Sequence, residues 1–199
     1  MNINPITFIL PHGLYKFQWE TIKDAANQLS INESSKILII DVDGCIRDGS
    51  HRYHLLPTQE QLDDAMSIWH DPQSAYKAFN DESVYDTRIQ PVIRLIQQLT
   101  ASGEYTPIVL TSCSSNEITT MGLLSQLRKW DVPCELICMR GKGNQNSSVT
   151  LKETFLNDLL QCGVKPYNIT ALDDDKDICN MMRSYDVLAL QVEDWTRGD

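Results

Sequence analysis

The sequence predicts an α/β domain in which helices flank an open parallel β-sheet. Short apolar segments rich in Ile, Leu and Val alternate along the chain with segments of helical periodicity, as in repeated β-α-β units. Several of the apolar segments end in carboxylates or hydroxyls. Because α/β folds bind ligands beyond the carboxyl ends of their parallel strands, these polar residues predict a functional site along one edge of the sheet.

The first core strand is predicted over residues 36–40, Lys-Ile-Leu-Ile-Ile. Such a run suits a strand that is buried on both faces. Asp41, Asp43 and Gly44 follow it directly. Residues i and i+2 of an extended chain share a face, so both carboxylates can reach one pocket, and Gly44 permits a sharp exit. Since Asp-Gly also marks ordinary turns, a plain loop is the alternative interpretation.

A helix and a second strand come next in the central part of the chain. Apolar residues at helical spacing predict a helix over 91–100, with Pro91 in its first turn and Gly103 just past its end. The following strand, 107–112, offers hydroxyl groups at its carboxyl end. Its Thr111 is therefore a candidate for the same sheet edge as the first acids.

The next helix is predicted to begin with a capping box formed by Ser114 and Glu117. The chain then returns as a strand over residues 135–139. A second capping box, Thr150 with Glu153, is predicted to open a further helix, which places Lys152 in its first turn. The cation of Lys152 would offset clustered acids.

The last helix of this pattern ends at Gly163, and a strand over residues 168–172 follows it. Asp173 and Asp174 stand at the end of that strand, and residues 187–192 form the last one. Two strands that deliver acids to one sheet edge suggest Mg²⁺, which prefers oxygen ligands. Purely structural roles are the alternatives. Asp173 and Asp174 would then be an acidic helix N-terminus, Thr111 a strand-end hydroxyl and Lys152 a solvated lysine.

These motifs in this order resemble the haloacid dehalogenase (HAD) superfamily of phosphatases. The four matching positions are Asp41-Val42-Asp43-Gly44, Thr111, Lys152 and Asp173-Asp174, and the resemblance spans about residues 36–195. Within the superfamily, residues 50–54, 139–143 and 172–174 are similar to phage phosphatases related to the 3′-phosphatase domain of polynucleotide kinase. The resemblance implies a Rossmann-like HAD fold with a small helical cap.

The resemblance also implies a chemical role for each motif residue. Asp41 would be the nucleophile that forms an aspartyl-phosphate, and Asp43 the general acid and then the base that activates water. Thr111 and Lys152 would contact the phosphate, whose transferring oxygens carry negative charge.

The metal ion implied by the resemblance is Mg²⁺. Its ligands would be Asp41, the carbonyl group of Asp43, and Asp173, while Asp174 would either bind the ion or orient a ligand.

The sequence departs from the closer relatives where they bind phosphate. Those relatives tend to have a Gly-Arg pair after the hydroxyl residue, whereas this chain has Ser112-Cys113, and Asp175 stands where they often have arginine. We therefore expect Ser112 and three arginines from other segments to bind the substrate phosphate: Arg47, Arg52 and Arg140.

The predicted organisation is an N-terminal extension, residues 1–35, followed by a HAD-like phosphatase domain, residues 36–199. A cap insert is expected at about 49–87, where the polar sequence breaks the strand-helix alternation. Such a cap would exclude water and select substrate. Its Trp69 and Phe79 either pack within the insert or stack on a base.

Charge and composition limit the partners. The 199-residue chain has 17 basic and 27 acidic residues, a net charge of −10, which argues against broad binding to a nucleic-acid backbone. Small phosphorylated ligands and the end of a nucleic-acid strand remain compatible with this charge.

No apolar segment reaches the roughly 18 residues of a membrane helix, and no signal peptide pattern occurs. We expect a cytoplasmic domain, in the host cytoplasm if phage-encoded, with reduced cysteines and no membrane or obligate protein partner.

The combined expectation is a Mg²⁺-dependent phosphomonoesterase that acts on nucleic-acid 3′-phosphate ends or on nucleotides. One alternative is a phosphatase for another small phosphorylated metabolite. The other is a HAD-fold binding protein with weakened catalysis, because phosphate-binding arginines are replaced. Retention of both Asp41 and Asp43 favours the enzyme, since a binding module needs neither a nucleophile nor an acid.

Overall fold

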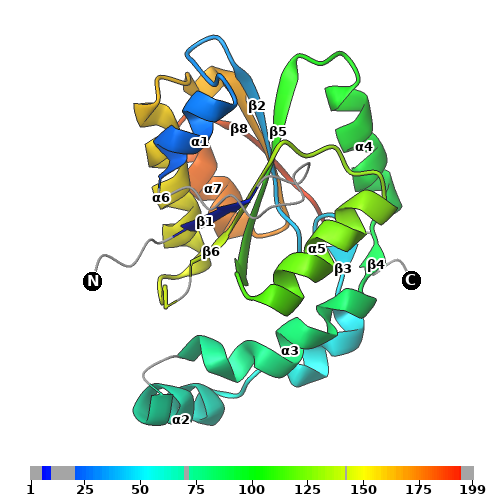
Figure 1. Cartoon of the computed structure of the whole chain (residues 1–199), viewed down its shortest axis with the longest axis vertical. Coiled ribbons are helices and arrows are strands. Elements are labelled where there is room, and N and C mark those ends of the chain that lie inside the picture. The colour runs from blue at the N-terminus through cyan, green and yellow to red at the C-terminus, as the bar shows by residue number, and fades with distance from the viewer. Residues whose placement is uncertain (1–5, 10–20, 70–71, 142, 194–199) are drawn as a thin grey trace.

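The computed structural model describes residues 6–9, 21–69, 72–141 and 143–193 and contains a six-stranded sheet (Figure 1). Five strands are parallel, and the edge strand β1 runs antiparallel to β6. The predicted parallel α/β architecture is confirmed. In sheet order the strands are β1 (Ile6–Ile9), β6 (Leu136–Arg140), β5 (Tyr105–Ser114), β2 (Lys36–Ile40), β7 (Ile169–Asp173) and β8 (Leu188–Gln191).

Helices cover both faces of this sheet (Figure 1). The side chains of β2 alternate between the two hydrophobic cores: Ile37 and Ile39 belong to one, Leu38 and Ile40 to the other. The central strand is thus buried on both faces, as its sequence predicts. The helices on the first face are α1 (Ile22–Gln28), α6 (Ser148–Gln161) and α7 (Lys176–Ser184), and those on the second are α4 (Gln90–Thr100) and α5 (Glu117–Lys129).

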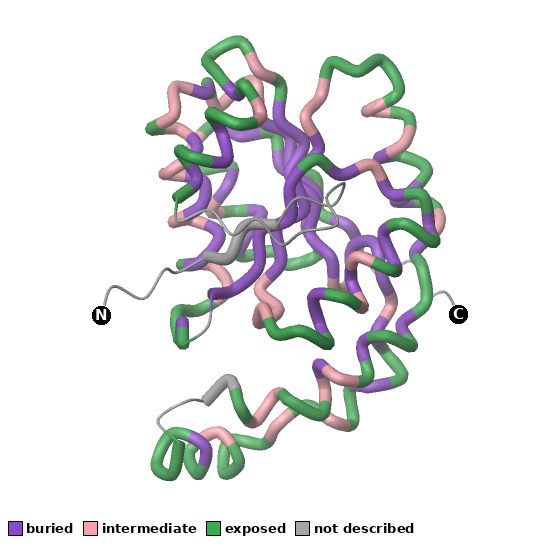
Figure 2. Tube along the Cα trace, in the orientation of Figure 1, coloured by how far each residue is buried: buried purple, intermediate pink, exposed green. Residues whose placement is uncertain are grey.

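A small helical cap stands at the carboxyl ends of the parallel strands, on a stem of two short strands (Figure 1). The cap elements lie between Arg47 and Arg88. The domain bounds expected from the sequence, with an insert at about 49–87, stay a prediction. Most of helix α2 is exposed (Figure 2). The cap elements are β3 (Arg47–Asp48), η1 (Ser50–Leu55), α2 (Gln59–Trp69), η2 (Pro72–Tyr76), α3 (Lys77–Asp81), η3 (Glu82–Tyr85) and β4 (Thr87–Arg88).

The two aromatic residues of the cap, Trp69 and Phe79, differ in burial. Trp69 is 71% exposed, so packing inside the insert is wrong for this residue. Phe79 is half-buried, and its ring lies 3.9 Å from the guanidinium carbon of Arg52. Phe79 therefore packs within the cap as a partner of a buried cation.

The predicted capping box of Ser114 with Glu117 is wrong. Strand β5 continues through Ser114, and Asn116 is the N-cap of α5. The Asn116 side chain accepts a bond of 2.9 Å from the backbone N–H of Thr119, whose hydroxyl accepts from the Asn116 N–H at 3.2 Å. The capping box is thus shifted by two residues, because the strand extends further than its apolar run.

The capping box of Thr150 with Glu153 is also wrong. Helix α6 begins one turn earlier, and the hydroxyl of its N-cap Ser147 accepts from the Thr150 N–H at 3.1 Å. Glu153 instead accepts a hydrogen bond of 2.8 Å from the hydroxyl of Tyr185. A run with several hydroxyl residues offers several equivalent caps, and tertiary contacts select one of them.

The described part of the N-terminal segment contributes helix α1 to the core and strand β1 to the edge of the sheet. Ile22, Ala25 and Ala26 of α1 are buried, as expected for a helix packed on the domain. Strand β1, which pairs Phe8 with Cys138, was not predicted. Another short element that the sequence did not indicate, η4 (Pro166–Asn168), precedes β7.

All six cysteines are free thiols, as expected. Among the described residues, no helix combines the length and the apolar character needed to cross a membrane.

Candidate active site

The predicted acids lie together because three neighbouring parallel strands end side by side. Strands β5 and β7 flank β2, and Ile40 pairs with Val109 on one side and Leu172 on the other. The backbone N–H of Asp41 donates to the Leu172 carbonyl at 2.9 Å, which brings Asp41 beside Asp173. The carboxyl ends of separate sequence segments thus form one site.

Lys152 joins two of these acids. Its Nζ lies 2.5 Å from Asp41 Oδ1 and 2.7 Å from Asp173 Oδ2, and all three residues are buried. Burial alone would lower the pKa of Lys152, but the two carboxylates more than offset it and raise the pKa above its ordinary value. Lys152 is therefore a charged ammonium group held between β2 and β7.

Asp174 completes a group of three carboxylates with Asp41 and Asp173, whose nearest ligand atoms all lie within 4.8 Å of one another. Gly44 makes room for it. A Cβ atom at residue 44 would lie 2.2 Å from Asp174 Oδ2, and the glycine has a φ of +79°. The positive φ therefore favours glycine, and a side chain at this position would displace the carboxylate of Asp174 from the group.

The charge of this group fits a divalent cation. Burial raises the pKa of Asp41 well above its usual range, and Asp173 and Asp174 raise it further, while Lys152 lowers it. Burial and the neighbouring Asp173 raise the pKa of Asp174 to about 6. One ammonium group thus faces three carboxylates, and oxygen donors with surplus negative charge are the ligand set that Mg²⁺ prefers.

The carboxylate of Asp43 lies outside this group and faces two arginines. Arg47 donates to it from Nε at 2.9 Å and from Nη2 at 3.1 Å, and Arg52 Nη2 also donates to it. Burial alone would raise the pKa of Asp43, but Arg47 and Arg52 more than offset it and lower the pKa. The predicted metal contact of Asp43 concerns its carbonyl group and stays a prediction.

Asp86 binds the same two arginines from the cap side. This residue was not among those predicted from the sequence. It accepts from Arg52 Nε at 2.8 Å and Nη2 at 2.7 Å, and its Oδ2 lies 3.2 Å from Arg47 Nε. Arg47 also donates to Gln126 of α5 at 3.2 Å, and Arg52 to the Phe79 carbonyl at 3.2 Å. The cluster therefore connects the cap to Asp43. No local sequence signal distinguishes Asp86 from other loop aspartates.

We predict that Asp86→Ala lowers the free energy of unfolding by about 3–5 kcal/mol, because it leaves Arg47 and Arg52 buried with only Asp43 as a carboxylate partner. The two arginines are 2% and 1% exposed. Urea denaturation measures the loss. Glu104→Ala is the control, since Glu104 pairs at 2.7 Å with Lys36 on the open surface and should matter little. A loss for Asp86→Ala as small as that of the control would contradict this prediction.

The remaining phosphate-binding candidates lie at the ends of β5 and β6. Thr111 is buried, and its hydroxyl accepts from the Cys113 N–H at 3.1 Å. Ser112 Oγ is buried without a hydrogen-bond partner. Arg140 donates to the carbonyl groups of Ser112, at 2.8 Å, and Asn146, at 2.5 Å. The structure thus brings Arg47 and Arg52 to the carboxylate of Asp43. Arg140 instead connects two backbone segments through these hydrogen bonds.

The aspartate at position 175, where relatives often have arginine, has a structural role. Its side chain caps helix α7 and accepts from the N–H groups of Asp177, at 2.7 Å, and Ile178, at 3.2 Å. A carboxylate at a helix N-terminus is stabilising. Asp175 is thereby a cap and lies outside the group of three carboxylates.

Several solved structures share this fold. A structure of a Pnkp1/Rnl/Hen1 complex matches at a TM-score of 0.54 and 20% identity, over 81% of this chain and 47% of that one. A structure of a dehalogenase with an intermediate complex matches at a TM-score of 0.53 and 10% identity, over 84% of this chain and 88% of that one. A haloacid dehalogenase-like hydrolase from Streptococcus pneumoniae matches at 0.53 and 16%, over 79% and 84%. A search of curated proteins found no match.

The fold and the acids at its strand ends define a HAD-type phosphatase domain. The family model for the polynucleotide kinase PNKP phosphatase domain matches residues 70–196. The chain belongs to this family. The matched span contains Thr111, Lys152 and Asp173, while Asp41 and Asp43 precede it and are placed by the structure. The chain spans 47% and 42% of the length of the chains that it matches in two solved Pnkp1/Rnl/Hen1 complexes.

Proposed function

We propose that the protein is a Mg²⁺-dependent phosphomonoesterase that forms an aspartyl-phosphate and acts on nucleic-acid 3′-phosphate ends or on nucleotides. The observation that supports it most is the position of Lys152, between Asp41 at 2.5 Å and Asp173 at 2.7 Å. The proposed nucleophile, a cation and a further carboxylate thus lie together at one edge of the sheet, where a phosphate oxygen could be bound.

The proposed reaction has two steps. An Asp41 carboxylate oxygen attacks phosphorus while the bond from phosphorus to the leaving oxygen breaks, and Asp43 gives that oxygen a proton. Asp43 then removes a proton from water, and the resulting hydroxide attacks the phosphorus of the aspartyl-phosphate. Inorganic phosphate leaves and Asp41 returns to its carboxylate form. Lys152 neutralises charge on the phosphate oxygens throughout.

The two buried arginines are the proposed phosphate ligands that replace the missing Gly-Arg pair. In the structure they bind Asp43 and lower its pKa, which favours the ionised form needed in the second step. A phosphate dianion competes with Asp43 for Arg47 and Arg52. Transfer of either guanidinium to the phosphate would raise the pKa of Asp43 and allow it to hold the proton needed in the first step. Ser112, Thr111 and Arg140 remain candidates for further phosphate contacts.

Mg²⁺ would be held by Asp41, Asp173 and the carbonyl group of Asp43, with Asp174 as a ligand or an orienting group. When bound, the ion supplies positive charge to the phosphoryl oxygens. The carboxylates of this chain supply the oxygen donors that it requires.

Two findings support a nucleic-acid or nucleotide substrate over another phosphorylated metabolite. The family is named for polynucleotide kinase, and two of the similar solved structures belong to a complex, one of them described as an RNA repair complex. The departures at Ser112 and Cys113 keep weakened catalysis as the second candidate.

The test is a phosphatase screen with Mg²⁺ over mononucleotides, sugar phosphates and 3′-phosphorylated oligonucleotides. We expect phosphate release to be fastest from the 3′-phosphorylated nucleotides and oligonucleotides. Equal or faster release from sugar phosphates would favour the metabolite phosphatase. Binding of these ligands without any release would favour the binding protein.

A further inference from the structure

A cleft of about 630 Å³ lies between the cap and the core at the carboxyl ends of the strands. One wall comes from the cap, around helix α3, and the other from the end of β5 and the start of α5, which lie close together in Figure 1. Its size is within the usual range for small-molecule sites.

Contacts of its wall residues connect the cleft to Asp43 and to the end of β5. Asn80, which lines it, is buried and accepts from Cys113 Sγ at 3.7 Å, two residues beyond Thr111. The neighbouring Phe79 binds Arg52 by its carbonyl and its ring, and Arg52 binds Asp43. The cap wall of the cleft is thus connected to Asp43 through Arg52, and its core wall belongs to the end of β5 just beyond Thr111.

The charge of the cleft is unfavourable for a polyanion. Among its described lining residues, Lys77 is the cation, whereas Asp81 and Glu117 are acidic, and Lys77 already pairs with Asp81. The lining charge is thus one negative unit, which would repel a second phosphate group close to the first. The serine and asparagine side chains that line the cleft can accept hydrogen bonds, so they suit hydroxyl and amino groups of a ligand instead.

The cleft also offers an apolar surface. Ile118, on the first turn of α5, is 49% exposed and lines it. A flat ring with polar edges satisfies both properties, because one face can lie on Ile118 while its edges meet the polar groups. A nucleoside has this chemistry and no charge of its own.

We infer that this cleft binds the nucleoside next to the scissile phosphate, and that recognition ends with this one nucleotide. The inference rests on the proposed phosphatase function and specifies its substrate. The enzyme would then act equally on a 3′-mononucleotide and on the end of a longer strand. The net charge of −10 agrees with this limit.

The first experiment compares kcat/KM of the wild-type protein for glycerol phosphate, a 3′-mononucleotide, a 3′-phosphorylated dinucleotide and a 3′-phosphorylated octamer. We expect a rise of about tenfold or more from glycerol phosphate to the mononucleotide, because the nucleoside adds transition-state binding. The values should then stay within about threefold along the length series, at low and high salt. A steady rise with length that fades at high salt would overturn the inference.

The second experiment tests the apolar wall. Ile118→Ala should lower kcat/KM for the mononucleotide by about tenfold but leave that for glycerol phosphate unchanged. Met121→Ala is the matched control, because Met121 lies on the same helix, is 54% exposed and does not line the cleft. Equal effects of the two variants, or an equal loss for both substrates, would contradict a nucleoside on Ile118.

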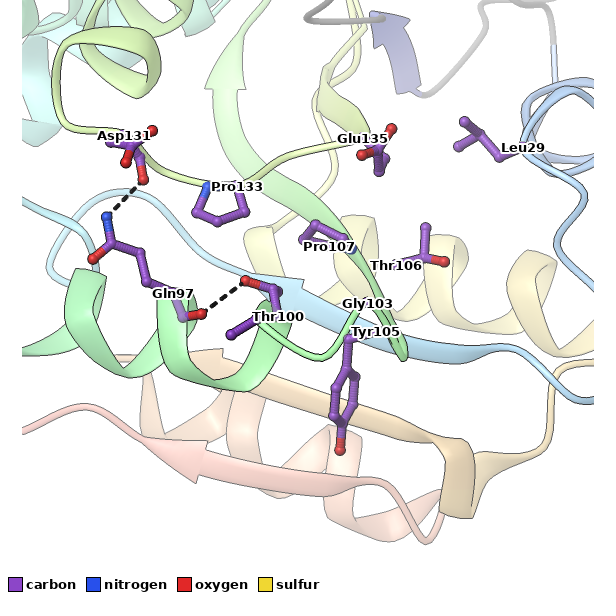
Figure 3. A pocket seen from close by; sticks show the side chains of 11 residues that line it. Leu29, Gln97, Thr100, Gly103, Tyr105, Thr106, Pro107, Asp131, Pro133 and Glu135 are labelled. Carbon is purple, nitrogen blue, oxygen red and sulfur yellow. Dashed lines mark hydrogen bonds between the residues drawn. The ribbon is translucent and has the colours of Figure 1, made fainter.

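The third experiment changes the charge. Asp81→Asn with Glu117→Gln should raise kcat/KM for the octamer over the mononucleotide by about tenfold at low salt, because the lining charge becomes positive. Asp131→Asn with Glu135→Gln is the control with the same change in net charge. These two residues line a separate cavity at the amino end of β5, where Gln97 donates to the Asp131 carbonyl at 2.8 Å (Figure 3).

The outcomes separate this inference from the proposed function. No phosphate release from any substrate would reject the phosphatase itself. A wild-type kcat/KM that rises with strand length would reject only the single-nucleotide site. The same would follow if the Asp131 and Glu135 double variant changed the ratio of octamer to mononucleotide kcat/KM as much as the Asp81 and Glu117 double variant.

Discussion

Replacing Asp41 with asparagine should lower kcat for a 3′-phosphorylated nucleotide by about a thousandfold or more. An amide is a poor nucleophile and removes one negative charge from the proposed metal site. The side-chain carbonyl oxygen of the asparagine can still accept the hydrogen bond that Lys152 donates to Asp41 at 2.5 Å. The fold should therefore persist, and the loss should lie in the chemical step.

Single-turnover kinetics and a thermal melt of the same preparation measure this expectation. Asp48→Asn is the matched control, because it makes the same chemical change seven residues along and keeps the acceptor for the Ser50 N–H at 2.9 Å. The control should retain wild-type turnover. If the Asp41 variant retains more than about a tenth of wild-type kcat, the assignment of the nucleophile is wrong.

Removal of divalent metal should abolish turnover, and added Mg²⁺ should restore it. Asp173→Ala should raise the Mg²⁺ concentration for half-maximal activity by more than about a hundredfold, because it removes a buried carboxylate of the proposed site. Asp174→Ala should cause a smaller, measurable rise, since that residue is exposed.

A Mg²⁺ titration of activity for each variant gives these values. Asp175→Asn is the control, because it removes a neighbouring charge and keeps an oxygen that can cap α7. Its Mg²⁺ requirement should equal that of the wild type. Full activity in excess chelator would exclude the proposed metal chemistry, and equal effects at 173 and 175 would show a general charge effect instead of ligand loss.

The sequence alone could predict which acids meet, because topology limits where they go. Asp41 follows β2, Thr111 lies near the carboxyl end of β5, and Asp173 is the last residue of β7. Parallel strands in one sheet present their carboxyl ends at the same edge. The distance between Lys152 and the acids, however, depends on how α6 packs on the sheet. Its predicted cap was wrong by three residues, yet Lys152 still lies beside Asp41 and Asp173.

The arginine cluster could not be predicted in this way. Arg47, Arg52 and Asp86 lie in the cap and its stem, whose short irregular elements carry no strong periodicity. Their pairing joins residues separated by 34 positions, as between Arg52 and Asp86. Burial of two guanidinium groups requires carboxylate partners, but many acids in the chain could have supplied them.

Local sequence patterns were enough to predict the alternation of strands and helices, the buried central strand, the order of the acidic motifs and the sharp exit at Gly44. These features follow from local periodicity and from chain direction, which act over a few residues or are set by topology. The partners of Asp43, the caps of α5 and α6, strand β1, and the cleft between cap and core depend instead on long-range packing. Each of these depends on which surfaces pack against one another, and side-chain burial and charge pairing across distant segments select among alternatives that the local sequence leaves equal.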